Sequence, residues 1–370
     1  MSISKKILTR EEQAVFALRE LYSSYGYLRY KVSKFEEYDL YARNKNFLIS
    51  ENILTFTDTD GRLMALKPDV TLSIIKNLGN SEAETHKLYY NENVYRTSAA
   101  ADGFREIMQI GLECIGRIDT YAMCEVIALA QKSLELISCD NILDVSHMGL
   151  ITGLTDSLEI DADQAKTLLT LIENKNTPAI KALCANIGVT EEKCAAICKM
   201  TTIYAPVKVA LEEIKDMLYT DKMQAAYAEL CGVCEYLERV GNVDKVYLDF
   251  STVNDMNYYN GITFKGFING IPDGVLSGGR YDRLMQKMGK SAGAVGFAVY
   301  LDMLARLSRE AAEYDVDTLL TYDESADVLS VLAMADSLRA DGKTVRVEFG
   351  TPDGIRCRER IDMTKGGARK

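Results

Sequence analysis

Histidine is scarce in this chain, and an excess of positive charge is missing. Only two of the 370 residues are histidines, and the formal net charge is −11. Two histidines are too few for a multi-histidine metal centre or for a histidine-based triad with spare candidates. Nucleic-acid-binding surfaces use lysine and arginine to neutralise phosphates, so the acidic balance argues against a nucleic-acid partner.

Long apolar runs and the common phosphate-binding glycine motifs are also missing. No run approaches the roughly 18 to 20 apolar residues that span a bilayer, and the first residues lack a secretory apolar region. We therefore expect a cytoplasmic protein with no membrane partner. Neither GxGxxG nor GxxxxGKS/T occurs, which argues against Rossmann and P-loop folds.

The nine cysteines are an odd number scattered along the chain, which suits free thiols in a reducing compartment. Cys231 and Cys234 form a CxxC. A second pair, Cys194 and Cys198, lies upstream, so a four-cysteine zinc site is one alternative. Because both pairs lie in helical patterns rather than in zinc-knuckle turns, we interpret them as buried helix cysteines. We expect neither a metal nor a cofactor.

Turn signals and apolar spacing predict an α+β fold with an antiparallel sheet flanked by helices. Residues 9–25 have the spacing of an amphipathic helix that begins at a capping threonine. Asp60-Gly61 and Asn269-Gly270 each separate short apolar segments, as in hairpins of antiparallel strands. The strands therefore come from both halves of the chain.

Two parts of unequal size are expected. Residues 1–310 form the first domain, and an almost wholly helical pattern at about residues 155–240 predicts a helical insertion into it. Residues 315–370 predict a strand, a helix and a strand, with frayed final residues. This small C-terminal α/β piece is too short for a complete, doubly covered α/β domain.

The predicted strand at residues 105–116 is the most informative segment. Its even-numbered residues from 108 to 114 are apolar and would face a core. Gln109, Gly111 and Glu113 share the other face, where the glycine leaves room for a small ligand against the backbone. A half-buried Glu113 needs a cationic or hydrogen-bonding partner, such as a ligand ammonium or imidazole. An internal ion pair with a neighbouring strand is the alternative.

Several ordered motifs give residues 1–310 a resemblance to class II aminoacyl-tRNA synthetases, specifically to the histidyl enzyme. In chain order they are LMALKPDVT (63–71), VYR with GFREIMQIGLECIG (94–116), NDMNYYNGITF (254–264), and SGGRYDRL with AVGFAVYLDML (277–304). They are similar to the family's proline–acid–threonine segment, its motif 2, its tyrosine signature, and its glycine-rich strand with motif 3. Any one of these motifs alone would be weak, whereas their shared order is specific.

The resemblance implies a pocket that selects histidine. The implied contacts are Asp69, Thr71 and Gln109 to the α-amino group, Glu113 and Tyr259 to the imidazole, and Tyr258 with the Gly278 and Gly279 backbone as pocket wall. Carboxylates and a phenol pair with an ammonium and an imidazole N–H, while a glycine wall admits the ring.

Departures from the family pattern imply that ATP chemistry is lost. Arg96 matches the motif 2 arginine that contacts the α-phosphate, but Asn254 and Met303 stand where the family has two further arginines. Loss of one such charge at a developing anion typically costs a rate factor of about a hundred or more. We therefore expect no catalytic residues. Arg96, Arg105 and Arg280 are candidate anion contacts, with carboxylate pairing as the alternative.

A non-catalytic member of this kind is the regulatory subunit of ATP phosphoribosyltransferase. The resemblance implies that histidine binding here feeds back on the first step of histidine biosynthesis. The implied partners are the short catalytic ATP phosphoribosyltransferase subunit, histidine as effector, and a second copy of this chain in a homodimer within a hetero-oligomer. A divergent histidyl-tRNA synthetase, an amino-acid-activating ligase and a scaffold with a vestigial pocket are the alternatives.

Overall fold

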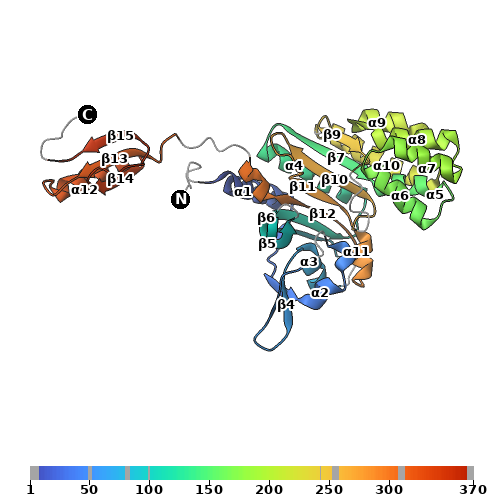
Figure 1. The fold of residues 1–370 in the computed structure, drawn as a ribbon, viewed down its shortest axis with the longest axis horizontal. Helices are drawn as coiled ribbons and strands as arrows, with labels where there is room; N and C mark the ends of the chain where they lie inside the picture. Colours follow the sequence, from blue (N-terminus) through green and yellow to red (C-terminus); the bar gives the residue numbers. More distant parts are fainter. Residues whose placement is uncertain are drawn as a thin grey trace. The chain divides into compact units, whose positions relative to one another are not determined.

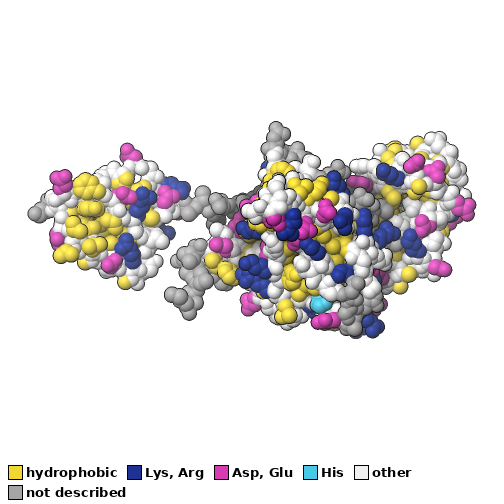
Figure 2. All heavy atoms as spheres, turned by 90° about the horizontal axis from the view of Figure 1, so that it is seen from below, with side chains coloured by type: hydrophobic (Ala, Val, Ile, Leu, Met, Phe, Trp, Pro, Cys, Tyr) yellow, Lys and Arg dark blue, Asp and Glu magenta, His cyan; other side chains and the backbone are white. Residues whose placement is uncertain are grey.

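The structure is a computed structural model that describes residues 8–48, 52–79, 84–98, 101–241, 243–251, 258–306 and 313–364. Contacts divide the chain into two compact units, Met1–Leu307 and Ser308–Lys370. Figure 1 shows the ribbon of each unit. No helix in the described ranges is long and apolar enough to cross a membrane. On the face of the first unit seen in Figure 2, lysine and arginine side chains lie among acidic and apolar ones.

The first unit is built around one large mixed sheet. Its elements are α1 (Arg10–Ser24), β1 (Leu28–Arg29), β2 (Phe35–Glu37), α2 (Tyr38–Ala42), η2 (Lys45–Phe47), β3 (Thr55–Thr57), β4 (Leu63–Leu66), α3 (Thr71–Asn77), β5 (His86–Ser98), β6 (Ala101–Gly116), α4 (Thr120–Ile137), β7 (Asn141–His147), α5 (Met148–Asp156), α6 (Ala162–Glu173), α7 (Thr177–Ile187), α8 (Glu191–Thr202), β8 (Tyr204–Pro206), α9 (Val207–Ile214), η3 (Lys215–Met217), α10 (Asp221–Arg239), β9 (Val246–Asp249), β10 (Ile262–Ile268), β11 (Leu276–Arg280), α11 (Asp282–Lys287), β12 (Gly293–Tyr300) and η4 (Leu301–Arg306).

The main sheet has the strand order β1-β5-β6-β12-β11-β10-β7-β9-β8, and β2-β4-β3 forms a separate small sheet. The predicted antiparallel arrangement holds for the main sheet except at β1–β5 and β7–β9, which are parallel pairs. The β3–β4 hairpin turns at Gly61, whose φ of +85° favours glycine. At Asn269-Gly270 the connection is longer than predicted, because β10 ends at Ile268 and β11 begins only at Leu276.

Helix α1 confirms the predicted amphipathic helix. Thr9 and Glu12 form a capping box at its start, in which the Thr9 hydroxyl accepts from the Glu12 N–H. Gly26 follows the helix with φ +80°, a left-handed conformation that ends it readily. The buried side of α1 includes Leu18 and Tyr22, which are fully buried, and it faces the main core.

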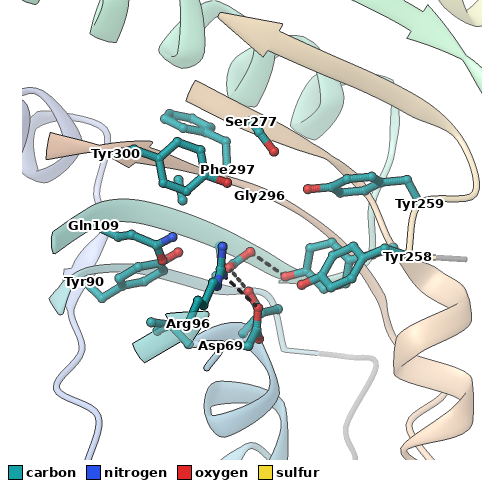
Figure 3. Close-up of a pocket in the computed structure, with 15 residues that line it drawn as sticks. Asp69, Tyr90, Arg96, Gln109, Tyr258, Tyr259, Ser277, Gly296, Phe297 and Tyr300 are labelled. Carbon is teal, nitrogen blue, oxygen red and sulfur yellow. Dashed lines mark hydrogen bonds and ion pairs between the residues drawn. The ribbon is translucent and has the colours of Figure 1, made fainter. Parts of the chain in front are cut away.

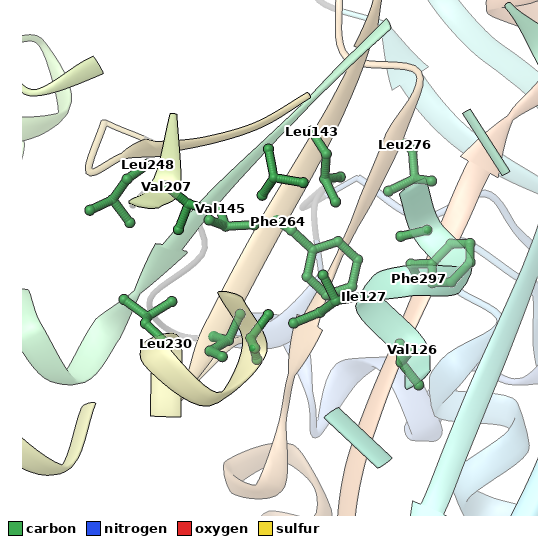
Figure 4. Close-up of a cluster of buried hydrophobic side chains, with 14 of the residues drawn as sticks. Val126, Ile127, Leu143, Val145, Val207, Leu230, Leu248, Phe264, Leu276 and Phe297 are labelled. Atoms are coloured by element: carbon green, nitrogen blue, oxygen red, sulfur yellow. The ribbon is translucent and has the colours of Figure 1, made fainter. Parts of the chain in front are cut away.

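Each face of the main sheet carries its own core. On one face the sheet packs against α1 and α4, where Phe264 and Phe297 meet Val126 and Ile127 of α4 (Figure 4). On the other face, near β5 and β6, a second core includes side chains of α2, α3 and α11. Since both faces are covered there, polar groups on the inner rows of β6 are removed from water.

Alternation along β6 holds from residue 109 onward but not at Met108. Ile110, Leu112 and Cys114 are fully buried, whereas Met108 is 41% exposed, so its predicted core position was wrong. The reason lies in the neighbouring strand. β12 pairs with β6 only from Gly116 to Gln109. The rest of β6, including Met108, has a strand neighbour on one side alone, which is β5.

The inserted segment is less purely helical than predicted. Helices α6 to α10 are present, but Tyr204–Pro206 forms β8, which pairs with β9 as the last strand of the main sheet. A three-residue strand carries too little periodicity to stand out between helical patterns. Pro206 is tolerated because an edge strand leaves one row of N–H groups without a ladder partner.

The second unit contains β13 (Val316–Tyr322), α12 (Val328–Ala340), β14 (Val345–Phe349) and β15 (Cys357–Asp362). The predicted strand, helix and strand are present. A further parallel strand, β15, was missed, and the sheet order is β14-β13-β15. Its sequence CRERID is mostly charged because an edge strand can leave its side chains in water.

Candidate functional site

A pocket opens on the sheet face that carries Gln109 and Glu113, opposite the α4 core (Figure 3). Its lining residues are Asp69, Val70, Thr71, Tyr90, Arg96, Gln109, Glu113, Tyr258, Tyr259, Ser277, Tyr281, Gly296, Phe297, Ala298 and Tyr300. Six of the eight predicted histidine-binding residues are among them. We call this cavity the sheet pocket.

Glu113 lies at the centre of the sheet pocket and is 2% exposed. The Thr71 hydroxyl donates to its Oε1 at 2.7 Å, and the Tyr281 hydroxyl donates to its Oε2 at 2.5 Å. The predicted alternative of an internal ion pair is not found, because no cation contributes to the environment of this carboxyl in the described chain. Two neutral donors therefore fix the carboxyl but supply no positive charge to its ionised form.

Gly296 gives Glu113 its space. Gly296 of β12 lies directly opposite Glu113 in the register of the two strands. A Cβ atom on Gly296 would overlap the Glu113 carboxyl and would lie 2.5 Å from the Leu112 carbonyl oxygen. The carboxyl can lie flat across the sheet only because this position carries no side chain.

Gly111 has a different role from the one predicted. A Cβ there would lie 2.6 Å from the Tyr90 hydroxyl oxygen, so the Tyr90 side chain fills the space that we assigned to a ligand. Tyr90 is opposite Gly111 on β5 and is buried. The open part of the sheet pocket thus lies nearer to Gly296 than to Gly111.

Asp69 and Arg96 form the polar wall beside α3. Asp69 is buried and its Oδ1 accepts from the Leu72 N–H at 2.8 Å, at the start of the helix. The Arg96 Nε donates to the Pro68 carbonyl at 2.8 Å, and a guanidinium nitrogen lies 4.0 Å from Asp69 Oδ2. Burial raises the pKa of Asp69, and Arg96 opposes that rise. Both charges remain available to a zwitterionic ligand.

Three tyrosines close the sheet pocket. Tyr258 packs edge-on against Tyr259 at 4.8 Å between ring centroids and against Tyr281 at 5.7 Å. Burial raises the pKa of Tyr258 and Tyr281 well above the usual phenol value, so both remain protonated. The cavity that they leave is only about 40 Å³. Typical ligand pockets are roughly 300 Å³ or more, so a bound amino acid requires these side chains to move.

The two predicted glycines of β11 face opposite ways. Gly279 lies on the pocket side, where a Cβ would be 2.8 Å from Tyr259 Cδ1. Gly278 lies on the core side, where a Cβ would overlap the Phe297 side chain. Gly278 therefore supports packing behind the sheet pocket and does not line it.

Two of the three candidate anion contacts lie outside the sheet pocket. Arg105 is exposed, and Arg280 is paired with Asp282 at 2.7 Å and with Glu229 at 3.5 Å. Arg96 alone of the three lines the pocket. For Arg280 the alternative to anion binding is therefore confirmed, because its guanidinium pairs with carboxylates.

The structure describes only one of the two positions at which the family's arginines are replaced. Met303 lies in η4, and its side chain packs against the main core rather than into the sheet pocket. Asn254 lies outside the described residues. No group of three or more histidine, cysteine or acidic side chains that could hold a metal occurs in the described ranges, and the nine cysteines are free thiols.

Ser277, Tyr281 and Gly296 are among the pocket residues that the sequence did not predict. Ser277 follows from the period of two on β11 once Gly279 is placed on the pocket side, and Tyr281 continues that period one residue past the strand. Gly296 needed the register between β12 and β6, which a single sequence does not contain.

The raised pKa of Glu113 predicts a pH-dependent stability. Burial raises it from 4.5 to about 8, and the hydrogen bonds from Tyr281 and Thr71 only partly oppose this. Between these values the folded state keeps a proton that the unfolded state releases. The free energy of unfolding should therefore fall with rising pH, by up to about 1.4 kcal/mol per unit.

Glu113→Gln mimics the protonated carboxyl and should remove this component, so the variant gains stability relative to wild type from pH 5 to pH 8. Urea unfolding at pH 5, 6.5 and 8 measures the effect. Glu106→Gln, at an exposed position on the same strand, is the control. An identical pH profile for wild type and Glu113→Gln would contradict the raised pKa.

Comparison with known proteins adds a family to this geometry. The sequence model described as Histidyl-tRNA synthetase matches residues 4–304. A curated relative, the ATP phosphoribosyltransferase regulatory subunit of Bacillus cereus (strain ATCC 10987 / NRS 248), is 28% identical over 351 residues. The alignment covers 91% of this chain and 82% of the relative.

Solved structures share the fold. An ATP phosphoribosyltransferase regulatory subunit/histidyl-tRNA synthetase from Bacillus halodurans has a TM-score of 0.76 at 22% identity, with 98% of this chain and 96% of that chain covered. Histidyl-tRNA synthetase from Nostoc sp. PCC 7120 has a TM-score of 0.72 at 19% identity, with 95% and 87% covered. A chain of the ATP phosphoribosyl transferase complex from Thermotoga maritima has a TM-score of 0.63 at 20% identity, with 79% and 97% covered.

These similarities confirm the predicted α+β fold class with its class II synthetase-like sheet. The family model covers most of the chain and includes every motif on which the predicted resemblance was based. The chain belongs to the histidyl-tRNA synthetase family.

Proposed function

We propose that this chain is a regulatory subunit of ATP phosphoribosyltransferase that binds histidine and confers feedback control on the first step of histidine biosynthesis. The observation that carries the proposal is a contrast between two groups of residues. The sheet pocket keeps buried carboxylates and phenols that suit an amino acid, whereas Met303, at a position where the family has an ATP-binding arginine, packs against the main core. The curated relatives that share this name support the same function.

Histidine is the ligand that the pocket chemistry favours. Its ammonium group would donate to the Asp69 carboxylate and to the side-chain oxygen of Gln109, while its carboxylate would lie near Arg96. Its imidazole N–H would donate to Glu113, whose carboxyl is already aligned by Thr71 and Tyr281. Asp69, Arg96 and Glu113 are buried, so an ionised form without a partner costs stability, and a ligand that pairs with these groups is stabilising.

The small size of the free cavity supports a regulatory role. Histidine can shift an equilibrium only if it binds one conformation better than the other. A cavity of about 40 Å³ is too small for histidine, so histidine binding would require Tyr258 and Tyr259 to move. Such a movement is a change that a catalytic partner could sense.

The proposed assembly contains a homodimer of this chain and the short catalytic ATP phosphoribosyltransferase subunit, in the cytoplasm. Histidyl-tRNA synthetase activity is proposed to be lost. The amino-acid-activating ligase is the second candidate, and the retained Arg96 in the sheet pocket is the feature that favours it. A ligase requires bound ATP, so the two functions differ in a measurable way.

We expect this chain, mixed with a short catalytic subunit, to form a stable complex whose phosphoribosyl transfer is inhibited by histidine. Size-exclusion chromatography with light scattering tests assembly, and a phosphoribosyltransferase assay with increasing histidine tests control. The chain alone should show no histidine-dependent exchange between ATP and pyrophosphate. Such exchange would support the ligase, while a complex insensitive to histidine would remove the regulatory role.

A further inference from the structure

A second cavity, of about 310 Å³, lies at the β8 end of the main sheet, on the same face as the sheet pocket. We call it the edge cavity. Its lining residues are Ile142, Asp144, Lys175, Tyr204, Asp249 and Phe267. The strand register shows that the two sites share a face, because Asp144 lies opposite Lys265 on β10 and Lys265 lies opposite Ser277 of the sheet pocket.

Asp144 is the unusual member of the edge cavity. It is 5% exposed, and its Oδ1 has no hydrogen-bond partner in the described structure. A buried carboxylate oxygen without a partner is costly, so a donor group that reaches this oxygen is stabilising. Burial, together with the nearby Asp249, raises the pKa of Asp144 to about 7, and a hydrogen bond from the Tyr204 hydroxyl to the Asp144 carboxyl partly opposes this rise.

The nearest cations do not satisfy Asp144. The Lys175 ammonium is bonded to Asp249 Oδ2 at 3.0 Å, and Asp249 Oδ1 also accepts from the Ser251 N–H at 2.8 Å. Lys265 is exposed, and its ammonium lies over the Phe267 ring at 5.5 Å from the centroid. The positive charges of both lysines oppose the rise in the pKa of Asp144, but neither lysine forms an ion pair with it.

The walls of the edge cavity are aromatic and apolar. Tyr204 of β8 stacks on Tyr247 of β9 with ring centroids 5.2 Å apart and an interplanar angle of 25°. The Lys175 ammonium lies 5.5 Å from the Tyr204 centroid, so this aromatic wall already attracts one cation. Ile142 and Phe267 supply the apolar contact for a hydrocarbon body.

We propose that the edge cavity binds an organic ammonium group, with Asp144 as its hydrogen-bond acceptor and counter-ion and with Tyr204 and Phe267 as aromatic walls. The same group is carried by a free small amine and by a lysine side chain of a partner protein. The edge cavity shares no lining residue with the sheet pocket, so its ligand is independent of what the sheet pocket binds.

The test is a calorimetric titration of the full chain with phenethylammonium chloride. We expect saturable binding that Asp144→Asn weakens by at least about tenfold, since asparagine keeps the shape of aspartate and removes its charge. The matched control is Asp244→Asn, an exposed aspartate just before β9, which should bind like wild type. 2-Phenylethanol, which has the same body with no charge, should bind at least about tenfold more weakly.

Two further variants keep the test decisive. Glu113→Gln should leave phenethylammonium binding unchanged, which separates the edge cavity from the sheet pocket. If Asp144→Asn does not fold, Tyr204→Phe and Tyr204→Leu replace it. Tyr204→Phe removes the hydroxyl that hydrogen-bonds Asp144 and keeps the aromatic wall, so it should retain binding, whereas Tyr204→Leu, at the same 48% exposed position, also removes the wall and should weaken binding severalfold. No saturable binding, or equal binding by wild type and either a folded Asp144→Asn or Tyr204→Leu, would overturn the proposal.

The source of the ammonium group is resolved by a second probe. An acetylated and amidated Gly-Lys-Gly peptide presents a lysine side chain on a peptide backbone, whereas n-butylammonium presents the same group alone. Peptide binding at least as tight as that of n-butylammonium would assign the edge cavity to a partner's lysine. Exclusion of the peptide, with n-butylammonium bound, would assign it to a free amine.

Discussion

Replacing Glu113 by glutamine is expected to weaken histidine binding by about ten- to a hundredfold at pH 8. A hydrogen bond to a charged group contributes roughly 1.5–3 kcal/mol, and glutamine keeps the size of the side chain but loses the charge. Isothermal titration with histidine measures the change. At pH 8 the free carboxyl is about half ionised, so wild type can offer a carboxylate to the imidazole N–H.

The control for this change is Glu106→Gln, which alters an exposed glutamate on the same strand and should leave the affinity for histidine unchanged. The pH dependence gives an independent check. Wild-type affinity should rise between pH 7 and pH 8.5 as Glu113 ionises, while the affinity of Glu113→Gln should lack that rise. Equal affinities at pH 8 would show that Glu113 is buried for packing and does not recognise the ligand.

Strong local signals made part of the fold predictable. Helix α1 begins directly after its capping residue Thr9 and ends shortly before Gly26, whose φ is positive, and the β3–β4 hairpin turns at Gly61. These features depend on neighbours in sequence. β8 and β15 were missed because their stability comes from a neighbouring strand rather than from their own pattern.

The pocket was predictable only in outline. Six of the residues chosen from the motif resemblance line one cavity, among them Asp69, Gln109 and Tyr258 from three distant segments. The resemblance could not say which side of β11 faces the pocket, and so it paired Gly278 with Gly279. A one-residue change of register reverses every side chain of a strand, and register depends on contacts between segments far apart in the chain.

Gly296→Ala is expected to abolish histidine binding and to destabilise the fold. The added methyl group would overlap the Glu113 carboxyl, which Thr71 and Tyr281 hold in place. The strand cannot retreat, because the Leu112 carbonyl lies 2.5 Å from the same Cβ position. Overpacking of a core typically costs 1–3 kcal/mol, and here it also displaces the proposed imidazole contact.

Thermal unfolding and histidine titration of Gly296→Ala measure the two effects together, and we expect a loss of affinity of more than about a hundredfold. The matched control is Gly232→Ala in α10, where a Cβ would be 3.6 Å from Thr120 and alanine should add up to about 1 kcal/mol of helix stability. If Gly296→Ala were destabilised but bound histidine normally, the contact between Gly296 and Glu113 would contribute to packing and not to ligand binding. The ligand would then have to lie against Asp69 and Arg96 without contact to Glu113.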